Sequence, residues 1–176
     1  MKSIYPIIIF LCACAFLLSI VTCTGRNDSS DRNAPDFKLS DIDGNRFYLS
    51  EQKDKVVLLN FWSIHCATCM VEMPKIQQLS DSLSKKRIRF VGICNDPGEG
   101  NYVESLLKRL GVTYTNLIDE QKAVSGKYSV TALPSTFILD YKRRIRYHTV
   151  GYDESYIKKY HEICETILHK YETEKE

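Results

Sequence analysis

The feature that most constrains this chain is a pair of cysteines placed where a buried strand should meet a helix. The run V-V-L-L-N-F at residues 56–61 follows charged residues and has the length of a buried strand. Cys66 and Cys69 come next, separated by two residues. Apolar residues then recur at three- and four-residue spacing from Met70 to Leu83, which predicts a helix with one buried face. The stretch therefore predicts a strand, a loop that carries two thiols, and a helix.

This placement favours dithiol–disulfide exchange. Cys66 is expected at the helix N-terminus, where unpaired backbone N–H groups and the helix dipole favour a thiolate over a thiol. Cys69 lies one helical turn further on, close enough to attack a mixed disulfide on Cys66 and release the partner. Cys66 is therefore the predicted nucleophile and Cys69 the predicted resolving cysteine.

The cysteine pair could also be a zinc half-site or a structural disulfide. Half of a structural zinc site would need a second Cys or His pair at short spacing, and Cys94, Cys164 and the four histidines do not supply one. We therefore predict no metal site. A purely structural disulfide stays open, although such bridges usually close longer loops.

The N-terminal residues read as a targeting segment. Residues 1–22 hold one early lysine and an apolar stretch of signal-peptide length, which predicts a signal peptide of the lipoprotein type or, as the alternative, an uncleaved membrane anchor. Ile20-Val-Thr-Cys23 resembles a bacterial lipobox, so Cys23 is the predicted lipidation site. Residues 23–33 are polar and predict a flexible tether. The folded domain, predicted over residues 34–172, would then lie outside the cytoplasm and be held at a membrane.

Length and charge limit the remaining possibilities. The chain has 176 residues, which suits one domain after an N-terminal segment, and its formal net charge is +2. No basic run or arginine–aromatic pattern indicates nucleic acid. We expect a protein that binds no nucleic acid.

The rest of the chain alternates strands and helices. An Asp-Gly turn between apolar pairs predicts a hairpin over 34–49 that precedes the main sheet. Apolar periodicity and turn signals then predict the following elements: strand 88–94, helix 102–110, strand 115–118, helix 121–128, strand 136–140, strand 145–150 and helix 154–171. This order predicts an α/β fold with a mixed sheet.

Three segments resemble one family. Residues 60–69, N-F-W-S-I-H-C-A-T-C, are similar to the N-F-W-A-T-W-C-x-P-C segment of the extracytoplasmic thioredoxin-like reductases of the TlpA and ResA group. Residues 34–44 and 128–140 are similar to two further segments of that group. His65 and Thr68 depart from the Trp and Pro that the group usually has.

The resemblance implies a fold and a set of site residues. The fold is thioredoxin-like, with a central mixed sheet flanked by helices, an N-terminal β-hairpin and an inserted helix typical of the TlpA group. The segment Cys69-Met-Val-Glu72-Met-Pro74 is similar to the C-x-x-E-x-P pattern of the group. This similarity implies that Glu72 is a buried carboxyl group that serves as acid and base for the thiols. Leu133 and a cis Pro134 imply a backbone edge that receives a cysteine-containing peptide.

Two side chains beside the cysteines have less defined roles. Trp62 is expected to pack beside the site, shield it and contact substrate. His65, if protonated, would favour the thiolate form of Cys66, or it acts as a surface residue that shapes partner choice.

The predicted function is reduction of disulfides in exported proteins. Apocytochrome c is one candidate substrate, and a membrane dithiol is the expected electron donor. We expect a monomer that needs no cofactor, because the redox-active pair Cys66–Cys69 itself carries the two electrons in its reduced dithiol form and becomes a disulfide when it gives them up. Alternatives are a disulfide-donating oxidase or isomerase, a peroxidase, a copper-binding thioredoxin-like protein, and a binding module without redox activity. The residues before Cys66 argue against a peroxidase, and the two-residue spacing argues against the copper chaperones.

Overall fold

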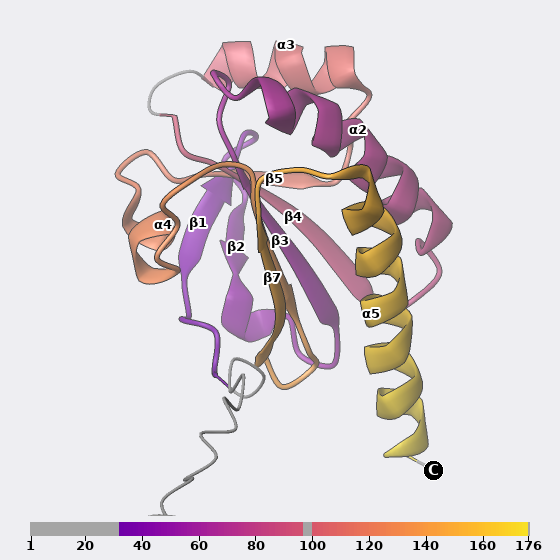
Figure 1. Cartoon of the computed structure of the whole chain (residues 1–176). Coiled ribbons are helices and arrows are strands. Elements are labelled where there is room, and N and C mark those ends of the chain that lie inside the picture. The colour runs from indigo at the N-terminus through magenta and orange to yellow at the C-terminus, as the bar shows by residue number, and fades with distance from the viewer. Residues whose placement is uncertain (1–31, 97–99, 176) are drawn as a thin grey trace, which may run out of the picture.

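A seven-stranded mixed sheet forms the centre of the computed structural model, which describes residues 32–96 and 100–175 (Figure 1). The strands run in the order β2-β1-β5-β4-β3-β6-β7. β3 pairs parallel with β4 and antiparallel with β6. The strand bounds are Lys38–Asp41 for β1, Arg46–Tyr48 for β2, Val56–Trp62 for β3, Ile88–Cys94 for β4, Thr115–Ile118 for β5, Ser135–Leu139 for β6 and Ile145–Val150 for β7. The predicted α/β fold with a mixed sheet is confirmed.

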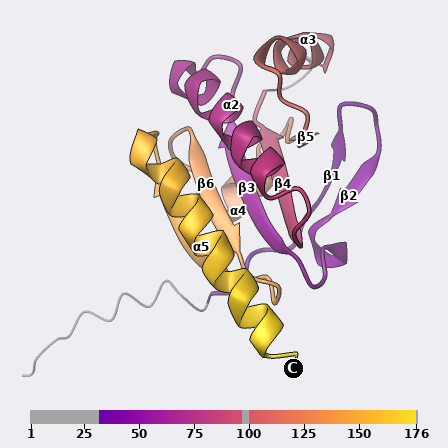
Figure 2. The same ribbon diagram turned by 90° about the vertical axis from the view of Figure 1, so that its right-hand side faces the viewer.

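Helices cover both faces of the sheet. α2 (Ala67–Ser82), α3 (Gly100–Leu110) and α5 (Glu154–Thr173) share one apolar cluster on one face. α4 (Ala123–Lys127) lies on the opposite face with the apolar side chains of the β1–β2 hairpin. Figure 2 shows α2 and α5 side by side over the strands. A short 3-10 helix, η1 (Leu49–Glu51), follows β2.

The N-terminal hairpin is part of the main sheet. The sequence predicts a separate ribbon ahead of it, but β1 pairs antiparallel with β5 through Ser40 and Asp41. Strand pairing across such a distance in sequence leaves no local signal, so only the hairpin itself was predictable. α4 is shorter than its predicted range of 121–128, because Lys122 adopts a left-handed conformation (φ 53°) just before it.

The ordered pairing begins before residue 34. Asn33 forms a β-bridge with Arg144, and the Arg32 carbonyl accepts a 2.8 Å hydrogen bond from the N–H of Ile145. Two residues of the predicted tether 23–33 are therefore held along the start of β7. The predicted signal peptide or anchor over 1–22 and the predicted lipidation site Cys23 lie outside the described residues. Within residues 32–96 and 100–175, no helix combines the length and apolar character needed to cross a bilayer.

Candidate functional site

The two cysteines lie at the junction between β3 and α2. All seven residues of β3 are buried, which fixes the strand inside the sheet. Cys66 is the N-cap of α2, in extended conformation (φ −98°, ψ 100°), and Cys69 lies in the first turn. The predicted order of strand, thiol loop and helix is therefore confirmed, with Cys66 at the helix N-terminus.

Cys66 and Cys69 form a disulfide, with their Cα atoms 5.2 Å apart. The two sulfurs differ in access, because Cys66 is half-buried whereas Cys69 has no exposed surface. An incoming disulfide can reach Cys66 alone. This asymmetry fits Cys66 as nucleophile and Cys69 as resolving cysteine.

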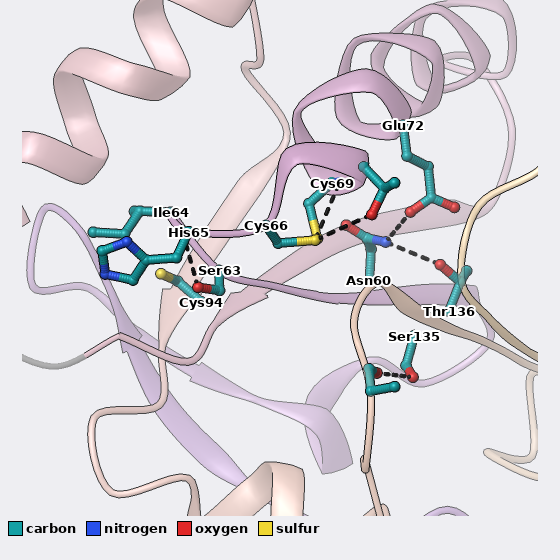
Figure 3. Close-up of a disulfide and its surroundings, with 12 residues drawn as sticks. Asn60, Ser63, Ile64, His65, Cys66, Cys69, Glu72, Cys94, Ser135 and Thr136 are labelled. Atoms are coloured by element: carbon teal, nitrogen blue, oxygen red, sulfur yellow. Dashed lines mark hydrogen bonds between the residues drawn. A yellow bond between two sulfur atoms is a disulfide. The ribbon is translucent and has the colours of Figure 1, made fainter.

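Two donors face the sulfur of Cys66. The backbone N–H of Cys69 donates to Sγ over 3.2 Å (Figure 3). The Thr68 hydroxyl lies 3.4 Å from the same atom. Hydrogen bonds to a charged acceptor favour the charged form. The site can therefore stabilise a Cys66 thiolate once the disulfide is reduced.

Glu72 is a fully buried carboxyl group three residues after Cys69 in α2. The side-chain nitrogen of Asn60 donates to its Oε2 over 2.8 Å, and the hydroxyl of Tyr160 donates to its Oε1 over 3.1 Å. Figure 3 shows the same Asn60 nitrogen also joined to the hydroxyl of Thr136, at 2.9 Å. Glu72 is thus held from β3 and α5 at once.

Burial raises the pKa of Glu72 from 4.5 to about 7. Desolvation disfavours the carboxylate, and the hydrogen bonds from Asn60, Tyr160 and Thr136 offset part of that effect. A carboxyl group with this pKa changes protonation near neutral pH, which is the range in which a general acid and base works. The environment expected for Glu72 is therefore present.

Trp62 is the last residue of β3 and lies buried just before the loop that carries Cys66. Its side chain has no exposed surface, and its indole N–H donates to Oδ1 of Asn116 in β5 over 3.0 Å. It packs in the same cluster as Cys69. Trp62 can therefore shield the site from beneath, but it offers no surface for the substrate contact expected of it, because the whole indole faces the core.

Asp96 braces the loop that precedes Cys66. Its carboxylate accepts the backbone N–H of Ile64 over 2.7 Å and the hydroxyl of Ser63 over 3.2 Å. The thiol of Cys94 also lies 3.6 Å from this carboxylate, and burial raises the pKa of that thiol to about 12. The sequence places Asp96 only in a turn after β4, and nothing local to it predicts this bracing role.

His65 is exposed, and its ring points away from the disulfide (Figure 3). Its backbone N–H donates to the Ser63 hydroxyl over 3.1 Å. The structure therefore places His65 on the surface beside Cys66, and its role stays a prediction.

The Leu133–Pro134 peptide bond is cis, as expected. Because β6 runs antiparallel to β3 and Phe61 opposes Ser135, Pro134 continues β6 toward the end of β3 that leads to Cys66. The Pro134 carbonyl accepts the N–H of Gly151 over 2.8 Å. Leu133 is half-buried, and within residues 32–96 and 100–175 its N–H and C=O make no backbone hydrogen bond. The backbone groups of Leu133 are therefore free of other backbone partners in the described part of the chain, and that Leu133 receives a peptide stays a prediction.

Possible metal ligands are not grouped in the described part of the chain: no cluster of three or more His, Cys, Asp or Glu side chains lies together there. The two remaining described cysteines, Cys94 and Cys164, are buried free thiols.

Comparison with known proteins gives one matching family and relatives that are named thiol-disulfide oxidoreductases. The sequence profile of the AhpC/TSA family matches residues 31–148. Thiol-disulfide oxidoreductase ResA of Geobacillus kaustophilus is 34% identical over 119 residues, a stretch that covers 67% of this chain and 67% of that protein. ResA of Bacillus subtilis is 29% identical over 136 residues, covering 76% of this chain and 75% of that protein.

A solved structure agrees on the fold. The crystal structure of a Chlorobium tepidum protein described as the thiol:disulfide interchange protein DsbE superposes with a TM-score of 0.73 at 23% identity, covering 79% of this chain and 97% of that chain. At this identity the match speaks for a thioredoxin-like fold alone.

Proposed function

Since this chain belongs to the AhpC/TSA family and, within it, to the thiol–disulfide oxidoreductases of the ResA type, we propose that it reduces disulfides in exported proteins from a tethered position at the outer side of a membrane. The observation that carries this proposal is the buried Glu72 carboxyl group, placed one turn after Cys69 and held by Asn60 and Tyr160. A carboxyl group so placed can take the proton of a thiol that must attack.

The proposed reaction starts from the reduced dithiol. The Cys66 thiolate attacks one sulfur of the substrate disulfide, the substrate S–S bond breaks, and the other substrate sulfur leaves as a thiolate. Cys69 then gives its proton to the Glu72 carboxylate and attacks Sγ of Cys66. The mixed disulfide breaks, the second substrate sulfur leaves, and the enzyme is left with the Cys66–Cys69 disulfide of this structure.

The proposed direction is supported by the residues between and beside the cysteines. Strong oxidases stabilise the reduced thiolate, which raises the reduction potential of the pair. Ala67 and Thr68 add no charge here, and the His65 ring points away from the disulfide. These features support a reductase over a disulfide donor.

Substrate and tether are the finer parts of the proposal. Leu133 offers free backbone groups to a cysteine-containing peptide, and the oxidised CxxCH segment of apocytochrome c is one candidate of that kind. Each turnover leaves the enzyme oxidised, so a membrane dithiol protein is the proposed electron donor. Lipidation of Cys23 is the proposed means of attachment, and intact-mass measurement of the membrane-extracted protein tests it directly.

The reduction potential of the Cys66–Cys69 pair tests the direction. The full chain is equilibrated in detergent with dithiothreitol or glutathione buffers, and free thiols are counted. A value near roughly −270 mV is expected for a reductase. A value near roughly −120 mV would make the protein a disulfide donor and remove the reductase proposal.

A further inference from the structure

The buried position of Glu72 raises the question of how its proton reaches water. Its side chain has no exposed surface, yet the proposed reaction delivers one proton to it from Cys69 in each turnover. Before the next turnover Glu72 loses that proton either to Cys69, when the disulfide is reduced again, or to water. Exchange with water requires a hydrogen-bonded path from the buried carboxyl group to the surface.

A row of polar residues crosses the sheet toward its edge. Asn60 in β3 is paired in register with Thr136 in β6, and Thr136 is paired with Thr149 in β7. Register partners on neighbouring strands project from the same face of a sheet. β7 is an edge strand, and Thr149 is half-buried, so the row leads from the interior toward solvent.

Tyr160 joins Glu72 to the outer end of this row. Its ring is fully buried on α5, and its hydroxyl lies 3.1 Å from Oε1 of Glu72. The same hydroxyl lies 2.7 Å from Oγ1 of Thr149. Three groups that can each give and accept a proton, Glu72, Tyr160 and Thr149, therefore form one continuous chain.

The other groups near Glu72 do not offer such a route. The Asn60 amide donates to Glu72, but its Oδ1 has no hydrogen-bond partner in the described structure. Tyr114 precedes β5, and burial together with the negative charge of Glu72 raises the pKa of its hydroxyl. This hydroxyl is buried and has no hydrogen-bond partner among the described residues. Thr136 is buried. The chain through Tyr160 alone leads to a residue that is partly exposed.

We propose that the hydroxyls of Tyr160 and Thr149 carry protons between Glu72 and water at the edge of the sheet. The inference rests on the proposed function. When protonated Glu72 releases its proton, the proton passes to the Tyr160 oxygen while the proton of Tyr160 passes to Oγ1 of Thr149. The Thr149 proton then passes to a water molecule. Both hydroxyls end neutral, and Glu72 becomes a carboxylate.

The test separates proton release from disulfide formation. The reduced full chain in detergent is mixed rapidly with the aromatic disulfide dithiobis-nitrobenzoate, whose thiol product is ionised at neutral pH. Formation of the Cys66–Cys69 disulfide releases two aromatic thiolates and the protons that Cys66 and Cys69 carry at the pH of the experiment, that of Cys69 among them. The thiolates are followed by their own absorbance, and the protons by an indicator dye at another wavelength.

The background protein carries Cys12→Ser, Cys14→Ser and Cys23→Ser, so that these thiols do not react. Cys94 and Cys164 have no exposed surface, and we expect them to react more slowly than the site. The fast phase then reports Cys66 and Cys69.

In the parent protein, the proton signal should keep pace with the second thiolate. In Tyr160→Phe and in Thr149→Val, proton release should lag behind the second thiolate by on the order of tenfold, because an acid–base group on the path is lost. Thr149→Ser keeps the hydroxyl and should restore the parent behaviour. Tyr156→Phe removes a tyrosine hydroxyl one turn earlier on α5 and should show no lag.

A purely structural role for Tyr160 would slow both signals together without a lag, and that result would overturn the proposed route. Failure of the parent protein to release the second thiolate would instead remove the proposed function. The two failures are therefore distinguishable.

Discussion

Asn60 and Glu72, twelve positions apart in the chain, are joined by a 2.8 Å hydrogen bond that links β3 to α2 inside the core. Asn60 interrupts an otherwise apolar strand, and its Oδ1 has no hydrogen-bond partner in the described structure. Burying such a group lowers stability. Asn60 is thus the polar residue of β3 that contacts the Glu72 carboxyl group. This hydrogen bond connects the core strand to the residue beside the redox-active cysteines.

The stability of the oxidised protein should fall as pH rises because of Glu72. Its pKa is about 7 in the folded chain and 4.5 as the reference value, so between these values the folded state binds more protons than the unfolded state. The free energy of unfolding should begin to fall near pH 4.5 and should reach its lower level above about pH 7. The total decrease should be on the order of 3 kcal/mol. Glu72→Gln cannot titrate and should lack this loss.

Denaturant unfolding with the disulfide intact, at roughly pH 5 and roughly pH 8, measures this difference. Glu172→Gln, which changes an exposed carboxylate on α5, should keep the pH dependence of the parent. Identical pH dependence in the parent and in Glu72→Gln would contradict the prediction.

Gly92 should not tolerate a side chain. A Cβ atom there would lie 2.0 Å from Oδ1 of Asn116 and 3.0 Å from Nε1 of Trp62, so the hydrogen bond between those side chains would have to shift. Gly92→Ala should lower the free energy of unfolding by about 1 to 3 kcal/mol and alter the fluorescence of Trp62. The chain has a single tryptophan, so the signal is unambiguous.

The matched control is Gly126→Ala. No atom lies within 4 Å of a Cβ at that position, and Gly126 lies in α4, so the change should leave the free energy of unfolding unaltered or raise it by up to about 1 kcal/mol. Equal effects at the two glycines would show that the close approach at Gly92 is not the cause.

Thr68 should tune the reactivity of Cys66. Its hydroxyl lies 3.4 Å from Sγ, so Thr68→Val removes one donor that can stabilise the thiolate of the reduced protein. Because Thr68 is exposed, water replaces part of the loss, and alkylation of Cys66 by iodoacetamide at neutral pH should slow by about three- to tenfold. Thr68→Ser retains the hydroxyl and should react at nearly the parent rate. An unchanged rate in Thr68→Val would rule out this contribution.

Asp96 should hold the loop before Cys66 in place. Asp96→Ala leaves the Ile64 N–H without its 2.7 Å acceptor and should destabilise the protein by about 1 to 3 kcal/mol. Hydrogen exchange at the Ile64 amide should accelerate. Asp96→Asn keeps an oxygen acceptor and should lose less protection. Unaltered protection of Ile64 in Asp96→Ala would show that the loop is held by other contacts.

Local features of the chain were predictable because they depend on neighbouring residues. The Cys66–Cys69 pair, the strand before it and the helix after it follow from apolar spacing and from thiol position. The importance of Glu72 came from the resemblance of C-x-x-E-x-P rather than from spacing, because an isolated glutamate on a helix usually faces water.

The partners of Glu72 were not predictable. In the sequence, Tyr160 is one more residue of an apolar stripe on the last helix, and it lies 88 positions from Glu72. Asn60 meets Thr136 across 76 positions. Such contacts depend on strand order and register, which local periodicity does not specify. The usable signal was a lone polar residue at position 60, inside a buried apolar strand.

Alternation along β3 divides the molecule into two separately packed halves. Val57, Leu59 and Phe61 join the cluster that includes α4 and the hairpin, whereas Val56, Leu58 and Trp62 join the cluster beneath the cysteines. Leu133 packs against both clusters, so the α4 side reaches the redox site at this one described residue of the two lists. Substitutions of Val57, Leu59 or Phe61 should therefore change the stability of the fold more than the immediate surroundings of the cysteines.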